Sequence, residues 1–408
     1  MDALQEMKNA TAPNSPPLPD KKRLIIVGLE IGTTKVCAAV GEIKPDDTLN
    51  LLGVGQAPSR GVRKGEIVDF DSAQKSVVKA LVDAEEKCDV MIKNVYLAIT
   101  GSHISSLNNR VSAIIPKEQE EIGDADCERV RESAKGVSLP AQNNIIHSIL
   151  QHYWIDGQEG ILNPVGLMGS LLEAGFHIIH GVRTRIQSPI RCVNELDVEV
   201  EDVVFGPYAA AQAILNQNQK NLGAVVIDFG GGTTDYIVYA DGVVKQSGVV
   251  SVGGDDIKTD ISTGLRTPLA IAEKLNIDEG SVMMDQNLSD NAIVLKREFG
   301  FAGREIERKT LNAIIYTRIR ETLIALRKRI AGEQDFKLIQ AGIFLTGGIS
   351  LVKGIGQLAE RIFEMPVHLP HTQAMEGASA AAKNPQFSAA IGLLIYGQRT
   401  GGHTRFRK

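Results

Sequence analysis

One arrangement of residues occurs twice in this chain, and it constrains the fold more than any other feature. The stretches RLIIVGLEIGTTKVCAAVG (residues 23–41) and IDFGGGTTDYIVY (residues 227–239) each place an acid, a glycine-rich turn and two threonines between apolar runs. Each copy continues into a third apolar run, LNLLGVG or VVKQSGVVSV. An internal repeat of this kind predicts two similar α/β halves with a cleft between them.

The two turns have the composition of phosphate-binding hairpins. Their glycines let backbone N–H groups approach a ligand closely, successive N–H groups form an anion nest, and the threonine hydroxyls add donors. A single turn would fit an ordinary glycine-rich hairpin, but two matched turns favour a phosphate site. We expect its contacts to come from both turns: Gly32, Thr33, Thr34, Lys35, Gly230, Gly231, Gly232, Thr233 and Thr234.

An acid ends the first strand of each copy. Glu30 and Asp228 would repel phosphate by themselves, so they predict a bound cation, Mg²⁺ held through water. Lys35 adds a point charge for phosphate. No residue has a spacing that identifies a hydrolytic base, so catalysis stays an open question.

A third element completes the pattern of a nucleotide site. The stretch GIFLTGGISLVKGIGQLAERIF (residues 342–363) predicts a strand, a Gly-Gly turn and a helix. Gly347, Gly348 and Ile349 would let a flat base or a ribose lie on the backbone. A GxGxxA match at residues 354–359 lies on the helix side of the unit, so it does not predict a dinucleotide site, and no P-loop motif occurs.

Two phosphate hairpins followed by a Gly-Gly turn, in this order, resemble the actin-like ATPase superfamily. The segment HYWIDGQEGILNPVGLMGSLLEAGFHIIHG (residues 152–181) is similar to the insertion domain of one branch, the FtsA family of bacterial cell division proteins. Further stretches of the sequence are similar to the same family: VGLEIGTTKV, SRGVRKGEIVD, VYLAITGSHI, GLRTPLAIAEKL and FLTGGISLVKGI. The resemblance runs from about residue 22 to residue 397, nearly the whole chain.

The resemblance implies an α/β, actin-like ATPase fold: two duplicated α/β halves around a nucleotide cleft, with an SHS2-like insertion subdomain (1C). The expected boundaries are 22–100 and 386–398 for subdomain 1A, 101–182 for 1C, 183–260 and 333–385 for 2A, and 261–332 for 2B. Residues 1–21 are expected to form a disordered N-terminal tail and residues 399–408 a short basic C-terminal tail. ATP and Mg²⁺ would occupy the cleft.

The adenosine side of the site departs from the family pattern. In the FtsA family the helix after the Gly-Leu-Arg-Thr-Pro element often reads Ala-Glu-x-x-Lys, and the resemblance places its Glu and Lys against adenosine. Here Glu273 matches, but Asn276 replaces the lysine. A charge-assisted hydrogen bond contributes about 1.5–3 kcal/mol, so ATP affinity about one to two orders of magnitude lower is expected unless another residue compensates. At most a slow ATPase is implied.

The stretch KTLNAIIYTRIRETLIALRKRI (residues 309–330) predicts a long amphipathic helix. Its apolar residues fall on one stripe: Leu311, Ile314, Ile315, Ile319, Leu323, Leu326 and Ile330. Residues 296–330 carry ten Lys or Arg and four Glu, which leaves a net charge of +6. In the FtsA family this region receives the acidic-apolar C-terminal tail of FtsZ. The resemblance therefore implies docking at Arg304, Arg308, Lys309 and Arg318, and a merely solvated basic face is the alternative.

Composition narrows the class of protein further. The 408 residues are 43% hydrophobic and 23% charged, and they include no apolar run that would span a bilayer and no signal-peptide core. Four cysteines without a CxxC pair argue for a reducing cytosol and against a zinc site. The net charge of −5 argues against nucleic acid as a partner.

The last ten residues, RTGGHTRFRK, carry four cations and no acid. A basic tail gains about 1 kcal/mol per cation at an anionic membrane surface. This tail alone therefore predicts weak membrane binding for a monomer, which a polymer would multiply.

By resemblance, the chain is an ATP-binding, actin-like division protein that polymerises, binds the C-terminal tail of FtsZ and tethers the Z ring to the inner face of the cytoplasmic membrane. Subdomain 1C would recruit later divisome proteins. The expected location is the cytoplasmic side of the membrane at the division site, and the cytosol when not assembled. The alternatives are a PilM-like pilus-assembly protein that binds ATP and, less favoured, a sugar-kinase-like phosphotransferase. The NPVGL string and the Gly-Leu-Arg-Thr-Pro element favour the FtsA family over PilM.

Overall fold

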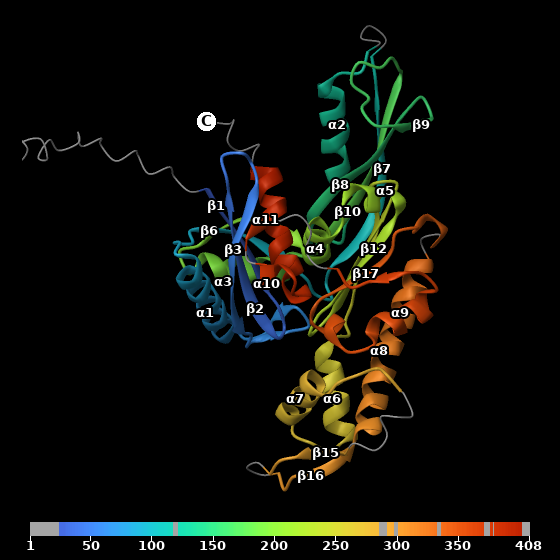
Figure 1. Ribbon diagram of the computed structural model, residues 1–408. Helices are drawn as coiled ribbons and strands as arrows, with labels where there is room; N and C mark the ends of the chain where they lie inside the picture. Colours follow the sequence, from blue (N-terminus) through green and yellow to red (C-terminus); the bar gives the residue numbers. More distant parts are fainter. Residues whose placement is uncertain are drawn as a thin grey trace, which may run out of the picture.

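The computed structural model describes most of the chain: residues 24–116, 121–284, 292–297, 301–332, 336–370, 376–377 and 379–401. The predicted N-terminal tail (1–21) and most of the predicted C-terminal tail (402–408) lie outside the described residues. Within them, two α/β halves lie side by side, with a small α/β domain at one end and a helical lobe at the other (Figure 1).

The first half is built on a six-stranded sheet. Its strands are β1 (Leu24–Ile31), β2 (Lys35–Ile43), β3 (Leu49–Pro58), β6 (Asn94–Ile99), β11 (Glu199–Phe205) and β19 (Glu376–Gly377), in the order β11-β6-β1-β2-β3-β19. β1, β2 and β3 form an antiparallel meander, and β6 joins β1 in parallel. Helices α1 (Phe70–Cys88) and α3 (Arg183–Asn194) pack on one face of the sheet, and α11 (Ser388–Gly401) packs on the other beside α4 (Gly206–Ile214).

The second half repeats this topology. Its strands are β12 (Ala224–Phe229), β13 (Thr234–Ala240), β14 (Val243–Val250), β17 (Gly342–Thr346) and β18 (Val367–His368), in the order β14-β13-β12-β17-β18. β12, β13 and β14 again form an antiparallel meander, and β17 joins β12 in parallel, as β6 joins β1. The predicted duplication of two α/β halves is therefore confirmed, because both copies of the sequence repeat fold into the same hairpin.

The helical lobe extends from the second half. It contains α6 (Gly254–Gly264), α7 (Leu269–Asp278), β15 (Ala292–Leu295), β16 (Arg304–Glu307) and the first part of α8 (Arg308–Ala331). α8 then runs back along the second half to α9 (Ile355–Phe363). The predicted apolar stripe of α8 faces the core, where all its members except the partly buried Ile314 are fully buried. This burial explains why a helix with so many charges is stable.

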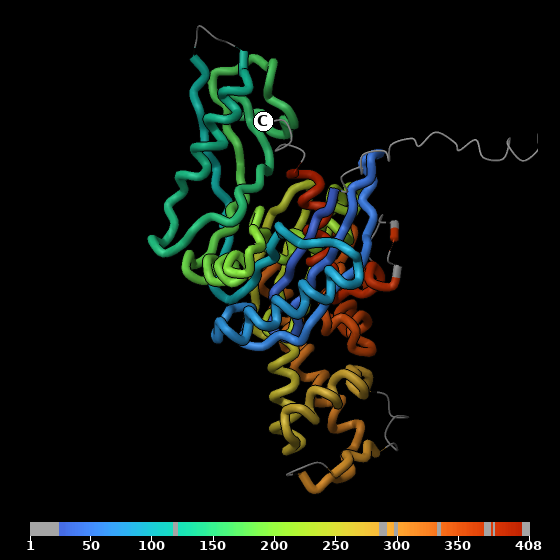
Figure 2. The backbone as a smooth tube through the Cα atoms, turned by 90° about the vertical axis from the view of Figure 1, so that its left-hand side faces the viewer, coloured from blue at the N-terminus to red at the C-terminus, as the bar shows by residue number. Residues whose placement is uncertain are grey.

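The insertion forms a separate sheet that leaves the first half between β6 and α3. Its strands are β7 (Ser105–Ile114), β10 (Leu171–Val182), β8 (Asn143–Ile155) and β9 (Gln158–Ile161), in the order β7-β10-β8-β9, and α2 (Asp124–Lys135) packs against them. We call this unit the insertion domain. In the turned view it lies at the opposite end of the molecule from the helical lobe (Figure 2).

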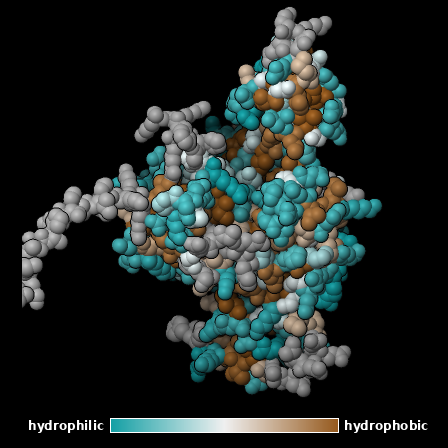
Figure 3. Space-filling view, turned by 45° about the horizontal axis from the view of Figure 1, so that its top comes forward, coloured by the Kyte–Doolittle hydropathy of each residue, from teal (hydrophilic) through white to brown (hydrophobic). Residues whose placement is uncertain are grey.

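Polar contacts fix the insertion domain to β14 of the second half. Ser106 Oγ donates to the Ser247 carbonyl at 2.7 Å, and the His177 ring lies between Asn108 Oδ1 (2.7 Å) and Ser247 Oγ (2.8 Å). The outer surface of the domain is partly apolar (Figure 3), and the side chains of Ile114, Leu162 and Met168 are exposed. The insertion domain is thus attached by its base and presents its tip to solvent.

Candidate functional site: a cleft between two hairpins

A cavity of about 320 Å³ lies where the β1–β2 and β12–β13 turns face each other. The two turns approach so closely that only glycine fits. A Cβ built on Gly231 would lie 2.4 Å from Thr34 Cγ2, and one on Gly232 would lie 2.3 Å from Thr33 Oγ1. Gly231 and Gly232 are therefore required by the contact between the two halves.

Nearly all the residues predicted for the nucleotide site line this one cavity. They are Glu30, Gly32, Thr33, Thr34, Lys35, Asp228, Gly230, Gly231, Gly232, Thr233, Glu273, Asn276, Gly347, Gly348 and Ile349. Thr234 does not line it, which corrects the prediction. Its fully buried hydroxyl donates instead to the Val252 carbonyl at 2.7 Å. The reason is strand alternation, because successive side chains of β13 point to opposite faces.

Three of the acids that line the cavity, Glu30, Asp228 and Asp235, interact electrostatically and form one cluster. Asp228 and Asp235 are direct cross-strand partners of β12 and β13. Burial raises the pKa of Asp228 well above its usual range, the charges of Glu30 and Asp235 raise it further, and Lys35 lowers it. Burial alone would lower the pKa of Lys35, but the charges of Cys37, Glu30 and Asp228 raise it above its ordinary value. The cluster is thus short of positive charge, a deficit that a cation would fill.

The described residues contain no group of three or more His, Cys, Asp or Glu side chains arranged to hold a metal ion by themselves. The carboxylates of Glu30 and Asp228 fit a different type of Mg²⁺ site. In that type one or two carboxylates act with the phosphates of a bound nucleotide, and several waters stay on the ion. The donor set therefore suits Mg²⁺ that arrives with a nucleotide.

Two further polar residues of the cavity were not predicted from the sequence. Thr100, which follows β6, donates its hydroxyl to Asp235 Oδ2, whereas the buried Oδ1 of Asp235 has no hydrogen-bond partner among the described residues. Burial raises the pKa of Asp235 to about 7, although hydrogen bonds from Thr100 and Thr233 lower it. Asp235 follows Thr234 directly, so strand alternation was a signal that could have placed it in the cavity.

The side of the cavity that the sequence predicts to face adenosine is lined by α7 and the Gly-Gly turn. Asn276 lines it, and its buried Oδ1 has no hydrogen-bond partner among the described residues. Gly348 has open space where a Cβ would lie. Two lysines that the sequence analysis did not predict, Lys258 of α6 and Lys353 before α9, also line the cavity. Unlike the neutral amide of Asn276, both lysine side chains are cationic hydrogen-bond donors.

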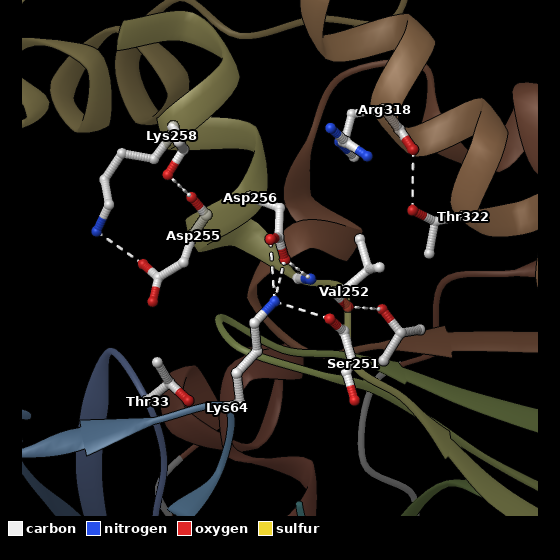
Figure 4. A network of polar contacts seen from close by, with 12 residues as sticks. Thr33, Lys64, Ser251, Val252, Asp255, Asp256, Lys258, Arg318 and Thr322 are labelled. Atoms are coloured by element: carbon white, nitrogen blue, oxygen red, sulfur yellow. Dashed lines mark hydrogen bonds and ion pairs between the residues drawn. The ribbon is translucent and has the colours of Figure 1, made fainter. Parts of the chain in front are cut away.

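An ion pair joins the two halves beside the hairpins. Lys64, in the turn between β4 (Val62–Arg63) and β5 (Glu66–Ile67), lies with its Nζ 2.7 Å from Asp256 Oδ2 and 2.7 Å from the Ser251 carbonyl oxygen (Figure 4). Asp256 also accepts from the Gly253 N–H at 2.9 Å at the start of α6. The next two N–H groups of α6 donate to the carbonyls of Gly230 and Gly231. Lys64 is thereby connected to the second hairpin.

The four basic residues predicted for partner docking do not share one environment. Arg308 forms an ion pair with Glu279 at 2.7 Å, and Arg318 forms a two-pronged pair with Asp260 at 2.6 and 3.0 Å. Both arginines therefore already have carboxylate partners within the fold. Arg304 and Lys309 are exposed, with no ion-pair partner among the described residues.

The duplicated halves and the cleft define the class of protein: this chain has the actin-like ATPase fold. Two solved structures cover most of it, the PilM–PilN type IV pilus biogenesis complex (TM-score 0.63, 14% identity, 91% of this chain and 98% of that chain) and ADP-bound MreB5 of Spiroplasma citri (TM-score 0.54, 16% identity, 94% and 98%). At these identities the likeness concerns the fold alone.

Sequence relatives give the particular family. The family model described as cell division protein FtsA matches residues 225–392, and that of the SHS2 domain inserted in FtsA matches residues 101–180. FtsA of Neisseria meningitidis is 37% identical over 92% of this chain and 90% of its own length, and FtsA of Escherichia coli K12 is 34% identical over 93% and 91%. The chain belongs to the FtsA family of actin-like cell division proteins. Among the described residues, no helix is long and apolar enough to cross a membrane.

Proposed function

We propose that this protein binds ATP with Mg²⁺, polymerises, binds the C-terminal tail of FtsZ and tethers the Z ring to the inner face of the cytoplasmic membrane. The observation that carries the nucleotide part is the contact between the two glycine hairpins, with acids, threonines and Lys35 around one cavity. Gly32, Gly230 and their neighbours would hold the phosphates. Glu30 and Asp228 would hold the cation through water, and Glu273, Asn276 and the Gly-Gly turn would face adenosine.

Closure of the cleft links the nucleotide to assembly in this proposal. The hairpins belong to different halves, so phosphates held between them would bias the two halves toward one relative orientation. A filament contact needs a fixed orientation of both halves. ATP therefore acts as an assembly ligand, and the proposal does not require its hydrolysis.

FtsZ docking is proposed at the N-terminal end of α8. The support is family membership together with the exposed charges of Arg304 and Lys309, which have no ion-pair partner among the described residues and suit an acidic tail. The test is co-sedimentation with FtsZ polymers and with FtsZ that lacks its C-terminal tail. We expect pelleting only with the intact tail, and equal pelleting with both would refute the docking.

Self-association, and recruitment of later divisome proteins, are proposed for the insertion domain. Its exposed apolar side chains at Ile114, Leu162 and Met168 support a protein contact. For the membrane, flotation with anionic liposomes in the presence and absence of ATP is the test. Flotation that requires ATP would support anchoring by a polymer, and its absence under both conditions would contradict the tethering.

A further inference from the structure

A groove of about 560 Å³ runs between the C-terminal part of α8 and α9, away from the nucleotide cleft. Five lining residues give it an apolar or aromatic floor, and four are cations. They are Tyr316, Arg320, Ile324, Arg327, Lys328 and Ala331 of α8, and Leu358, Arg361 and Ile362 of α9. Among the residues that the structure describes, no acid lines the groove.

The positive charge of the groove is largely uncompensated. Arg327 forms an ion pair with the exposed Glu364 at 3.0 Å, and the Nε of Arg361 donates to a carbonyl of its own helix. Arg320 and Lys328 form no ion pair within the described part of the chain. Elsewhere on α8, Arg308 and Arg318 are both neutralised. Ion pairs within the described part of the chain therefore do not account for the cations that gather here.

We propose that this α8–α9 groove is a docking site for an acidic, amphipathic peptide segment of a partner protein, distinct from the FtsZ surface. Arginine guanidinium groups match carboxylates in a two-pronged geometry. Tyr316, Ile324 and Ile362 would take apolar side chains of the same segment. From Tyr316 to Ala331 the groove is about 22 Å long, which suits a helix of about fifteen residues.

The shape and composition of the groove favour a peptide over other anions. A flat anionic membrane would not reach the floor of a groove between two helices. Nucleic acid would leave the apolar floor unused, and the acidic chain as a whole repels it.

The groove is also separate from the proposed FtsZ surface. Lys309 and Lys328 lie at opposite ends of α8, about 28 Å apart along the helix axis. The two sites can therefore be tested independently on the full chain.

The probe is a fluorescein-labelled fifteen-residue helical peptide with leucines on one face and flanking glutamates, read by anisotropy. We expect it to bind, and its twin with glutamines in place of the glutamates to bind at least about tenfold more weakly. The double variant Arg320→Glu/Arg361→Glu should weaken binding by a similar factor. The matched control Arg304→Glu/Lys309→Glu has the same net charge and should change it by less than about twofold.

Hydrogen exchange on the unmodified chain provides a readout that does not depend on variants, and the peptide should protect residues 316–331 and 355–363. The proposal would be overturned by equal binding of both peptides or by no effect of the groove variant. It would also be overturned if a fifteen-nucleotide oligo(dT) or anionic phosphatidylglycerol vesicles bound this groove more strongly than the acidic peptide. An FtsZ tail peptide should still bind the groove variant. Its loss there, but not in the control, would place the FtsZ tail in the groove and would refute a separate site.

Discussion

Lys64 of the first half and Asp256 of the second half form an ion pair across the cleft, with the ammonium 2.7 and 2.9 Å from the two carboxylate oxygens. The same ammonium donates a hydrogen bond to the Ser251 carbonyl. Asp256 accepts from the Gly253 N–H at the start of α6, the helix that is hydrogen-bonded to the second hairpin. This pair therefore joins the two halves directly beside the proposed phosphate site.

Lys64→Ala should speed nucleotide release. The pair is partly exposed (28% and 30% of the two side chains), so its contribution is modest and the dissociation rate of a fluorescent ATP analogue should rise up to about fivefold. Stopped-flow displacement measures this rate. Arg191→Ala, which breaks the exposed Arg191–Glu195 pair, is the control and should leave it unchanged. An unchanged rate in Lys64→Ala would show that the pair does not help to hold the cleft closed.

Gly231→Val should block ATP binding by forcing the hairpins apart. Its Cβ would overlap Thr34, and overpacking of this kind costs about 1–3 kcal/mol or more. Gly348→Ala is the matched comparison, because its Cβ meets open space in the cavity. We expect Gly348→Ala to keep the wild-type melting temperature yet bind ATP more weakly, since the added methyl occupies the proposed adenosine surface. Normal ATP affinity of Gly231→Val by calorimetry would refute the phosphate cradle.

Asp228→Asn should remove the dependence of ATP affinity on Mg²⁺. Asp228 lines the cavity beside Glu30 and Lys35, and the neutral amide cannot balance a divalent ion. Calorimetric titration with ATP in Mg²⁺ and in EDTA gives the ratio of affinities, which should fall to near one in the variant. The exposed Asp46→Asn is the control. A wild-type ratio in Asp228→Asn would contradict its role at the metal.

The free energy of unfolding of the nucleotide-free protein should fall as pH rises, and Asp235 is the group responsible. Its pKa is raised from 3.8 to about 7, so the folded state binds a proton more tightly than the unfolded state does. The free energy of unfolding therefore falls between about pH 4 and pH 7, by an amount on the order of a few kcal/mol. Asp235→Asn should flatten this dependence in urea unfolding at pH 5 and pH 8. A pH slope equal to that of the wild type would show that Asp235 is not the group responsible.

The duplicated halves and most of the cleft could be predicted from the sequence because their chemistry is local. A turn that needs glycine, an acid at a strand end and adjacent threonines all occur within a dozen residues, and they occur twice. The error at Thr234 and the omission of Asp235 arose at the same place, where the alternation of β13 decides which side chain faces the cavity.

Only the tertiary structure could bring in residues from distant segments. Thr100 reaches Asp235 across 135 positions, and Lys64 reaches Asp256 across 192. Arg308 and Arg318 find carboxylates 29 and 58 residues away, so a basic run in the sequence did not equal a basic surface in the fold. The sequence by itself determined which chemistry each turn carries. Packing of the two halves decided which groups meet and which charges stay free, because an ion pair or a buried acid depends on distances that the order of residues does not specify.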